Sequence, residues 1–186
     1  GFGRLLVILL TMGILASVVL NQYSSTLETL FHENYKSVVY AQSMKDAIDE
    51  INDNIKQSLW SAEENAQIIL FQKPISRFET QLNLEKSNIT IPGEAKLVSS
   101  LQTAWLLYVG HLNEISKLSS EVERRAYYKT SLRSDQRELK SFAQDIIDIN
   151  LGNITSVDGK AKESAKVARN AMAALIVTGI TIAILF

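Results

Sequence analysis

The apolar residues of the chain are concentrated at its two ends. Residues 5–20 read LLVILLTMGILASVVL and residues 171–186 read AMAALIVTGITIAILF, and neither run contains a charged side chain. A helix of this length extends about 24 Å, and flanking residues can lengthen the first run toward the ~30 Å hydrocarbon core of a bilayer. The pattern predicts two transmembrane helices, residues 1–20 and residues 171–186, the second one truncated in a protein that continues beyond Phe186.

Two other interpretations of these runs are weaker. A cleavable signal peptide needs a small-residue cleavage site and then a break, yet no proline or glycine occurs between Ile14 and Pro74. A buried core helix would seldom be this long without any charge. Arg4 is the one basic residue outside residues 21–170. By the positive-inside tendency it places the N-terminus in the cytoplasm and residues 21–170 outside it.

The segment after the first apolar run has a heptad pattern. Apolar residues fill seven of the eight positions reached in steps of seven from Leu20, with Asn34 as the exception. The series is Leu20, Leu27, Asn34, Ala41, Ile48, Ile55, Ala62 and Ile69. Such a repeat is typical of a helix that packs against partners. It predicts one helix from Leu5 to about Gln72, which Pro74 ends or kinks.

Three further helical stretches follow. A short amphipathic one surrounds Phe78, and the polar run that ends in Pro92-Gly93 is expected to be the distal connection, farthest from the membrane. Apolar residues at three- and four-residue spacing predict a helix over 94–128, and another from about Leu132 into the second apolar run. The predicted fold is all-α: an up-down-up-down four-helix bundle, residues 21–170, continuous with two transmembrane helices.

The amino-acid composition excludes several classes of protein. The chain has no cysteine, two histidines and a net charge of −1, which excludes disulfide-stapled modules and cysteine-ligated metal sites and argues against a nucleic-acid binder. No nucleotide-binding, nucleophile-elbow or metalloprotease motif occurs. We therefore expect no catalytic residue, metal site or cofactor in this sequence, and an enzymatic role for it is disfavoured.

Five residues are weak candidates for ligand contact. Asn34, Lys45 and Asn52 are polar positions that interrupt the apolar pattern of the first helix. A polar residue on a bundle seam fixes register or oligomeric state, and it can also line a pocket. Trp105 and Tyr108 are aromatic residues on the later helix, where packing in the core competes with a ligand-binding role. The sequence leaves both alternatives open for all five.

Two segments carry a resemblance to a known family. The run from Glu33 to Asp49, ENYKSVVYAQSMKDAID, resembles the first periplasmic helix of KinB-like bacterial sensor histidine kinases. The run from Leu84 to Glu94, LEKSNITIPGE, followed by Leu101 and Trp105, is similar to a second part of the same sensor domain. The resemblance covers the sensor domain and not the output domain, which this sequence lacks.

The resemblance implies a function and a set of partners. It implies a homodimer whose small-molecule or ion signal alters a HAMP and kinase module beyond Phe186, and through it a cytoplasmic response regulator. Together with the apolar runs, it predicts a two-pass protein of the bacterial inner membrane, in contact with the lipid bilayer, with residues 21–170 in the periplasm. It transfers no ligand, because the paired arginines of related nitrate sensors are absent from the first periplasmic helix.

Two alternatives remain beside the sensor kinase. A methyl-accepting chemoreceptor has a similar four-helix sensor and differs downstream of Phe186. A membrane-anchored helical scaffold would sense no small molecule at all. The stimulus, the direction of signalling and the sign of regulation are not encoded in any pattern of the chain.

Overall fold

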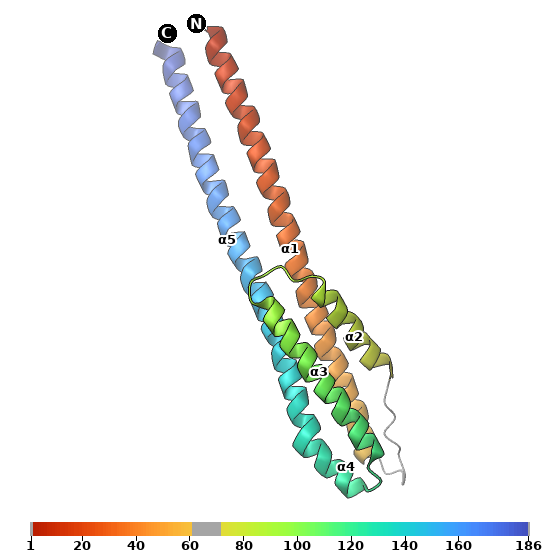
Figure 1. Cartoon of the computed structure of the whole chain (residues 1–186). Coiled ribbons are helices and arrows are strands. Elements are labelled where there is room, and N and C mark those ends of the chain that lie inside the picture. The colour runs from red at the N-terminus through yellow and green to blue at the C-terminus, as the bar shows by residue number, and fades with distance from the viewer. Residues whose placement is uncertain (1, 61–71, 186) are drawn as a thin grey trace. The chain divides into compact units, whose positions relative to one another are not determined.

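The computed structural model describes residues 2–60 and 72–185, and within these ranges every regular element is helical. Side chains near both ends are described only in part. The elements are α1 (Phe2–Trp60), α2 (Gln72–Lys86), α3 (Glu94–Lys117), α4 (Glu121–Tyr127), the π-helix η1 (Tyr128–Leu132) and α5 (Arg133–Leu185) (Figure 1). The continuation of the first helix toward Gln72 falls mostly on residues 61–71, outside the described residues.

The chain divides into two compact units. One unit is made of residues 1–32 and 153–186, so it contains the first part of α1 and the last part of α5. Several large apolar side chains of this unit are exposed, among them Ile14, Val167, Met172 and Val177. The other unit, Glu33–Gly152, contains the rest of α1 and α5 together with all of α2, α3, α4 and η1.

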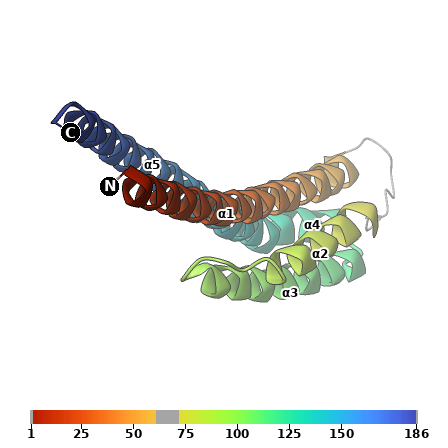
Figure 2. The same cartoon turned by 90° about the horizontal axis from the view of Figure 1, so that it is seen from above.

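The unit Glu33–Gly152 is a bundle of four helical arms. Its arms are the second part of α1, α2, α3, and the continuous run of α4, η1 and the first part of α5 (Figures 1 and 2). Successive arms run in opposite directions, as short connections require of neighbouring helices. The predicted all-α, up-down-up-down bundle is confirmed for this unit.

Apolar residues from all four arms fill the bundle core. Phe78 of α2 lies on Trp105 of α3 in a stacked pair, with ring centroids 3.8 Å apart. The largest side chains that are almost fully buried include Met44, Ile48, Leu59, Leu101, Tyr108, Leu112, Ile115, Leu132, Leu139 and Ile146. Along each helical arm these residues are separated by one or more steps of three or four positions, so the bundle uses the stripe that the sequence pattern predicts.

The expected helix over 94–128 is interrupted. α3 ends at Lys117, and Ser120 caps a new helix by accepting a hydrogen bond from the backbone N–H of Glu123 at 3.5 Å. Serine followed three residues later by glutamate is a capping-box arrangement. The chain therefore reverses at residues 118–120, ten residues earlier than the expected end, and α4 belongs to the fourth arm.

The Pro92-Gly93 connection was expected at the distal end, and the structure corrects this. The α2–α3 loop lies at the end of the bundle where α1 enters it, because Asn88 Nδ2 donates to Glu33 O at 2.8 Å and to Ser37 Oγ at 2.9 Å. Gly93 has a φ of 94°, a conformation that other residues rarely adopt. This loop is therefore fixed by side-chain hydrogen bonds to α1.

A buried polar cluster lies beneath this loop. Glu94 Oε2 accepts from the backbone N–H of Thr90 at 2.8 Å, and Glu94 Oε1 accepts from Asn150 Nδ2 at 2.6 Å. Glu85 is fully buried, and neither of its carboxyl oxygens has a hydrogen-bond partner of good geometry. Burial is the main cause that raises the pKa of Glu85 to about 7; a nearby Ser37 hydroxyl opposes this shift, and the charge of Glu94 adds to it.

The expected membrane placement is wrong. Among the residues that the structure describes, no helix has a stretch both long and apolar enough to cross a bilayer. Most side chains of residues 5–20 lie outside the described part. The two-pass inner-membrane assignment, with residues 21–170 periplasmic, is therefore withdrawn.

The raised pKa of Glu85 predicts a pH-dependent stability. The folded state holds the proton up to about pH 7, whereas the unfolded chain releases it near the ordinary glutamate pKa of 4.5. The free energy of unfolding should fall by up to about 3 kcal/mol as pH rises across this window. Urea unfolding at about pH 5 and about pH 8 measures this. Glu85→Gln should remove this fall, and the exposed Glu79→Gln should keep it; an equal fall in Glu85→Gln would contradict the assignment.

Candidate functional site

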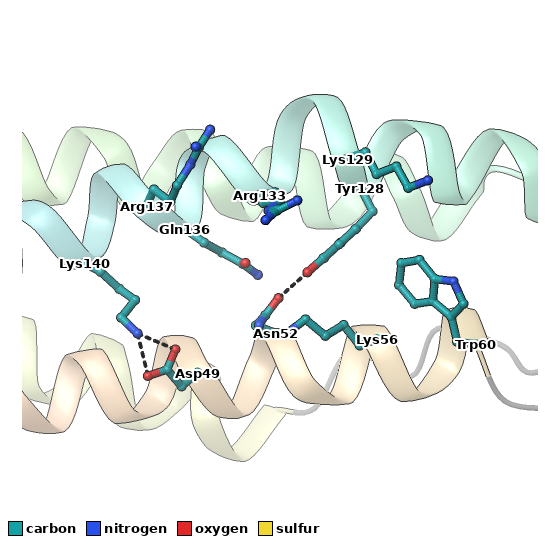
Figure 3. Close-up of a pocket in the computed structure, with 10 residues that line it drawn as sticks. All are labelled: Asp49, Asn52, Lys56, Trp60, Tyr128, Lys129, Arg133, Gln136, Arg137 and Lys140. Carbon is teal, nitrogen blue, oxygen red and sulfur yellow. Dashed lines mark hydrogen bonds and ion pairs between the residues drawn. The ribbon is translucent and has the colours of Figure 1, made fainter.

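A cavity of about 680 Å³ opens between α1 and the opposing run of η1 and α5 (Figure 3). It lies wholly within the unit Glu33–Gly152. Its lining residues are Asp49, Asn52, Lys56, Trp60, Tyr128, Lys129, Arg133, Gln136, Arg137 and Lys140. The set is mostly polar and charged, in contrast to the bundle core.

Helical spacing places these residues on two facing walls. Asp49, Asn52, Lys56 and Trp60 are three or four residues apart, which puts them on one face of α1. Tyr128 and Lys129 open the π-helix η1, and the remaining residues follow on α5. Single-turn π segments are frequent at functional sites because they shift the side chains that follow.

Two direct contacts cross the cavity. Lys140 Nζ donates to both carboxylate oxygens of Asp49, each at 2.7 Å, and so closes one end. The Tyr128 hydroxyl donates to Asn52 Oδ1 at 2.6 Å (Figure 3). Burial raises the pKa of Tyr128, an effect that the neighbouring Arg133 opposes and Asp53 reinforces. The phenol is thus a neutral donor at physiological pH.

Trp60 forms an aromatic border to the cavity. Its ring meets that of Tyr128 edge-on, with centroids 5.5 Å apart. The guanidinium carbon of Arg125 lies 5.7 Å from the Trp60 ring centroid, and Arg125 Nε donates to Leu59 O at 2.9 Å. About 47% of Trp60 is exposed, so its position is defined by these neighbours rather than by deep burial.

The cavity carries a large excess of positive charge. Its lining has five cationic side chains, Lys56, Lys129, Arg133, Arg137 and Lys140, and one carboxylate, Asp49. Lys140 forms an ion pair with Asp49, and the Nζ of Lys56 lies 3.5 Å from an oxygen of Asp53. Across the described ranges, Lys129, Arg133 and Arg137 form no ion pair with a carboxylate.

Gln136 connects the cavity to the bundle core. Its amide Nε2 donates to the hydroxyl of Tyr108 at 3.0 Å, and both residues are buried. Burial raises the pKa of Tyr108, while the hydrogen bond from Gln136 acts in the opposite direction. A rearrangement of α5 at the cavity would therefore disturb a buried polar contact with α3.

The candidate residues from the sequence are dispersed over the bundle. Asn52 lines the cavity. Lys45 Nζ donates to Gln144 Oε1 at 2.5 Å and joins α1 to α5 outside the cavity lining. Asn34 is fully buried in the polar cluster below the α2–α3 loop, where its Oδ1 accepts from the Thr90 hydroxyl at 3.1 Å and its Nδ2 has no partner.

The two aromatic candidates lie in the core. Trp105 stacks on Phe78 and has 3% of its surface exposed, and Tyr108 is fully buried. Neither lines the cavity. Sequence reasoning did not identify Lys129, Arg133 and Arg137, although the three cations recur at intervals of four residues.

The described residues contain no cluster of typical metal ligands. No group of three or more histidine, cysteine or acidic side chains in them can hold a metal ion. Comparisons with protein-family models, curated proteins and solved structures gave no match. The arrangement in the cavity suits the binding of a negatively charged molecule between two helices.

The core position of Trp105 predicts a large loss of stability on truncation. Trp105→Ala removes the stacked partner of Phe78 and leaves a cavity, so the free energy of unfolding should fall by about 3–5 kcal/mol. The neighbouring Leu106 is 65% exposed, and Leu106→Ala should change the free energy of unfolding by less than about 0.5 kcal/mol. Urea unfolding followed by circular dichroism distinguishes the two. Equal, small effects would show that Trp105 does not support the core.

Proposed function

We propose that the chain is the ligand-sensing region of a two-component sensor histidine kinase. In this proposal a small molecule binds between α1 and α5, and the resulting rearrangement passes along these helices to a HAMP and kinase module that this sequence does not contain. The observation that carries the sensing role is the charged cavity between the two helices. The kinase assignment is supported by the resemblance of residues 33–49 and 84–94 to KinB-like sensors.

The position of the cavity suits a signalling role. α1 and α5 are the elements that extend from the bundle unit into the unit formed by residues 1–32 and 153–186. Their contacts inside the bundle include the pairs Lys45–Gln144 and Asp49–Lys140. A ligand that favours one arrangement of these contacts shifts the equilibrium between arrangements, provided that it binds the two unequally.

The partners follow from the same resemblance. We propose a homodimer that responds to a small-molecule or ion signal, with a cytoplasmic response regulator as the downstream protein. Nucleic acid is not expected to be a partner, because the whole chain has a net charge of −1. The concentration of cations in the cavity therefore serves a local site rather than a broad basic surface.

A thermal-shift screen of metabolites and ions against residues 1–186 tests the sensing role. A molecule that binds the folded bundle should raise Tm by about 2–5 °C at saturating concentration. Arg133→Gln should reduce the shift by about half at the same ligand concentration, whereas Arg169→Gln, at an exposed position outside the cavity, should keep it. A broad screen without any stabilising molecule would support the scaffold alternative and overturn the proposal.

The kinase assignment has a separate test. In the intact protein, the molecule found in the screen should change the rate of autophosphorylation from ATP, and Arg133→Gln should remove that response without removing basal autophosphorylation. Absence of any autophosphorylation in the intact protein would refute the kinase half and leave the sensing half in place.

A further inference from the structure

The ligand class can be inferred from the charge of the cavity, on the assumption of the sensing role proposed above. We infer that the cavity binds a small organic oxyanion that carries two or more negative charges on a planar or apolar body. Carboxylate and phosphate groups share the required chemistry, since both present oxygens in the geometry that arginine and lysine bind.

The first argument is electrostatic. Arg133 and Arg137 are four residues apart on α5, so these like charges are neighbours on the helix surface and oppose helix formation, and Lys129 precedes them in η1. No carboxylate among the described residues pairs with them. An anion between the walls would relieve this repulsion and add charge-assisted hydrogen bonds.

The second argument is the placement of the cations. Lys56 projects from α1, whereas Lys129 and Arg133 come from η1 and α5 (Figure 3). In this view Arg133 lies between Gln136 and Tyr128, and Arg137 points away from α1 toward the rim. Lys56 also lies 3.5 Å from an oxygen of Asp53, whereas Lys129 and Arg133 have no carboxylate partner in the described part of the chain, and two such unpaired charges favour a dianion over a monoanion.

The third argument is the shape and lining of the site. A volume of about 680 Å³ is far larger than one inorganic anion needs and lies within the range of small-molecule pockets. Trp60 and Tyr128 give the cavity an aromatic end, and Trp60 is partly exposed. An organic body can contact these rings while its acidic groups meet the cations.

Isothermal titration calorimetry with defined probes tests the inference on residues 1–186. At about pH 8, isophthalate and phenyl phosphate are both dianions on a planar ring, the first with two carboxylates and the second with one tetrahedral phosphate, and they distinguish a carboxylate from a phosphate preference. Benzoate has one charge, isophthalamide has none, and inorganic phosphate has no organic body. At least one of the two dianions should bind, and each of the other three should bind about 10-fold more weakly or not at all.

Variants connect the binding to the cavity. Arg133→Gln and Lys129→Gln should each lower the affinity for the dianion by about 10-fold, because each removes a charge-assisted hydrogen bond. Arg169→Gln should leave the affinity unchanged, and circular dichroism should show all three variants folded. The affinity should also fall as sodium chloride is raised, since partly exposed charges are screened.

The outcomes separate this inference from the proposed function. Failure of both dianions to bind, or equal binding by benzoate and isophthalate, overturns the ligand class, while a stabilising molecule found in the screen would still support sensing. A dianion that binds with unchanged affinity in Arg133→Gln and Lys129→Gln overturns the site. Dianion binding without any change in autophosphorylation supports the site and counts against the sensor kinase.

Discussion

The uncompensated positive charge between α1 and the run of η1 and α5 is the constraint on which the functional account depends. Lys129, Arg133 and Arg137 have no carboxylate partner in the described part of the chain, and Lys56, which lies 3.5 Å from an oxygen of Asp53, projects from α1 on the opposite wall. Such a surface has an electrostatic cost that an anion can remove. Because cations lie on both walls, an anion bound between them would contact both helices. Its binding would therefore change how the two helices pack.

The bundle separates rigid from adjustable contacts. On the α2 and α3 side, Phe78, Trp105 and their neighbours form a dense aromatic and aliphatic core, which tolerates little displacement. On the α1 and α5 side of the cavity, the contacts that cross it are hydrogen bonds and ion pairs such as Asn52–Tyr128 and Asp49–Lys140. Polar contacts of this kind exchange readily for water or ligand, so rearrangement is expected there.

The sequence predicted the bundle because heptad spacing places residues such as Ile48 and Ile55 on one buried stripe. It misplaced the third chain reversal, although Ser120 and Glu123 form a recognisable capping pair. It misplaced the α2–α3 loop, because the hydrogen bonds of Asn88 to Glu33 and Ser37 join residues more than fifty positions apart. No local pattern encodes such contacts.

The candidate site was predicted only in part, for a similar reason. Asn52 was visible as a polar interruption of an apolar series, and it does line the cavity. Arg133 carries no such signal, because one arginine on a helix is ordinary until the opposite wall is known. The membrane placement is corrected by the finding that no described helix has a stretch both long and apolar enough to cross a bilayer.

The distance between α1 and α5 across the cavity is the quantity that tests the account most directly. The chain has no cysteine, so Gln57→Cys and Glu138→Cys, both at exposed positions, provide two specific sites for spin labels. Pulsed electron paramagnetic resonance would measure the distribution of distances between the two spin labels, without ligand and with saturating isophthalate or phenyl phosphate. The account predicts a shifted or narrowed distance distribution with the dianion, and a smaller change at the same dianion concentration when the labelled protein also carries Arg133→Gln. An identical distribution at a dianion concentration that calorimetry shows to be saturating would contradict it.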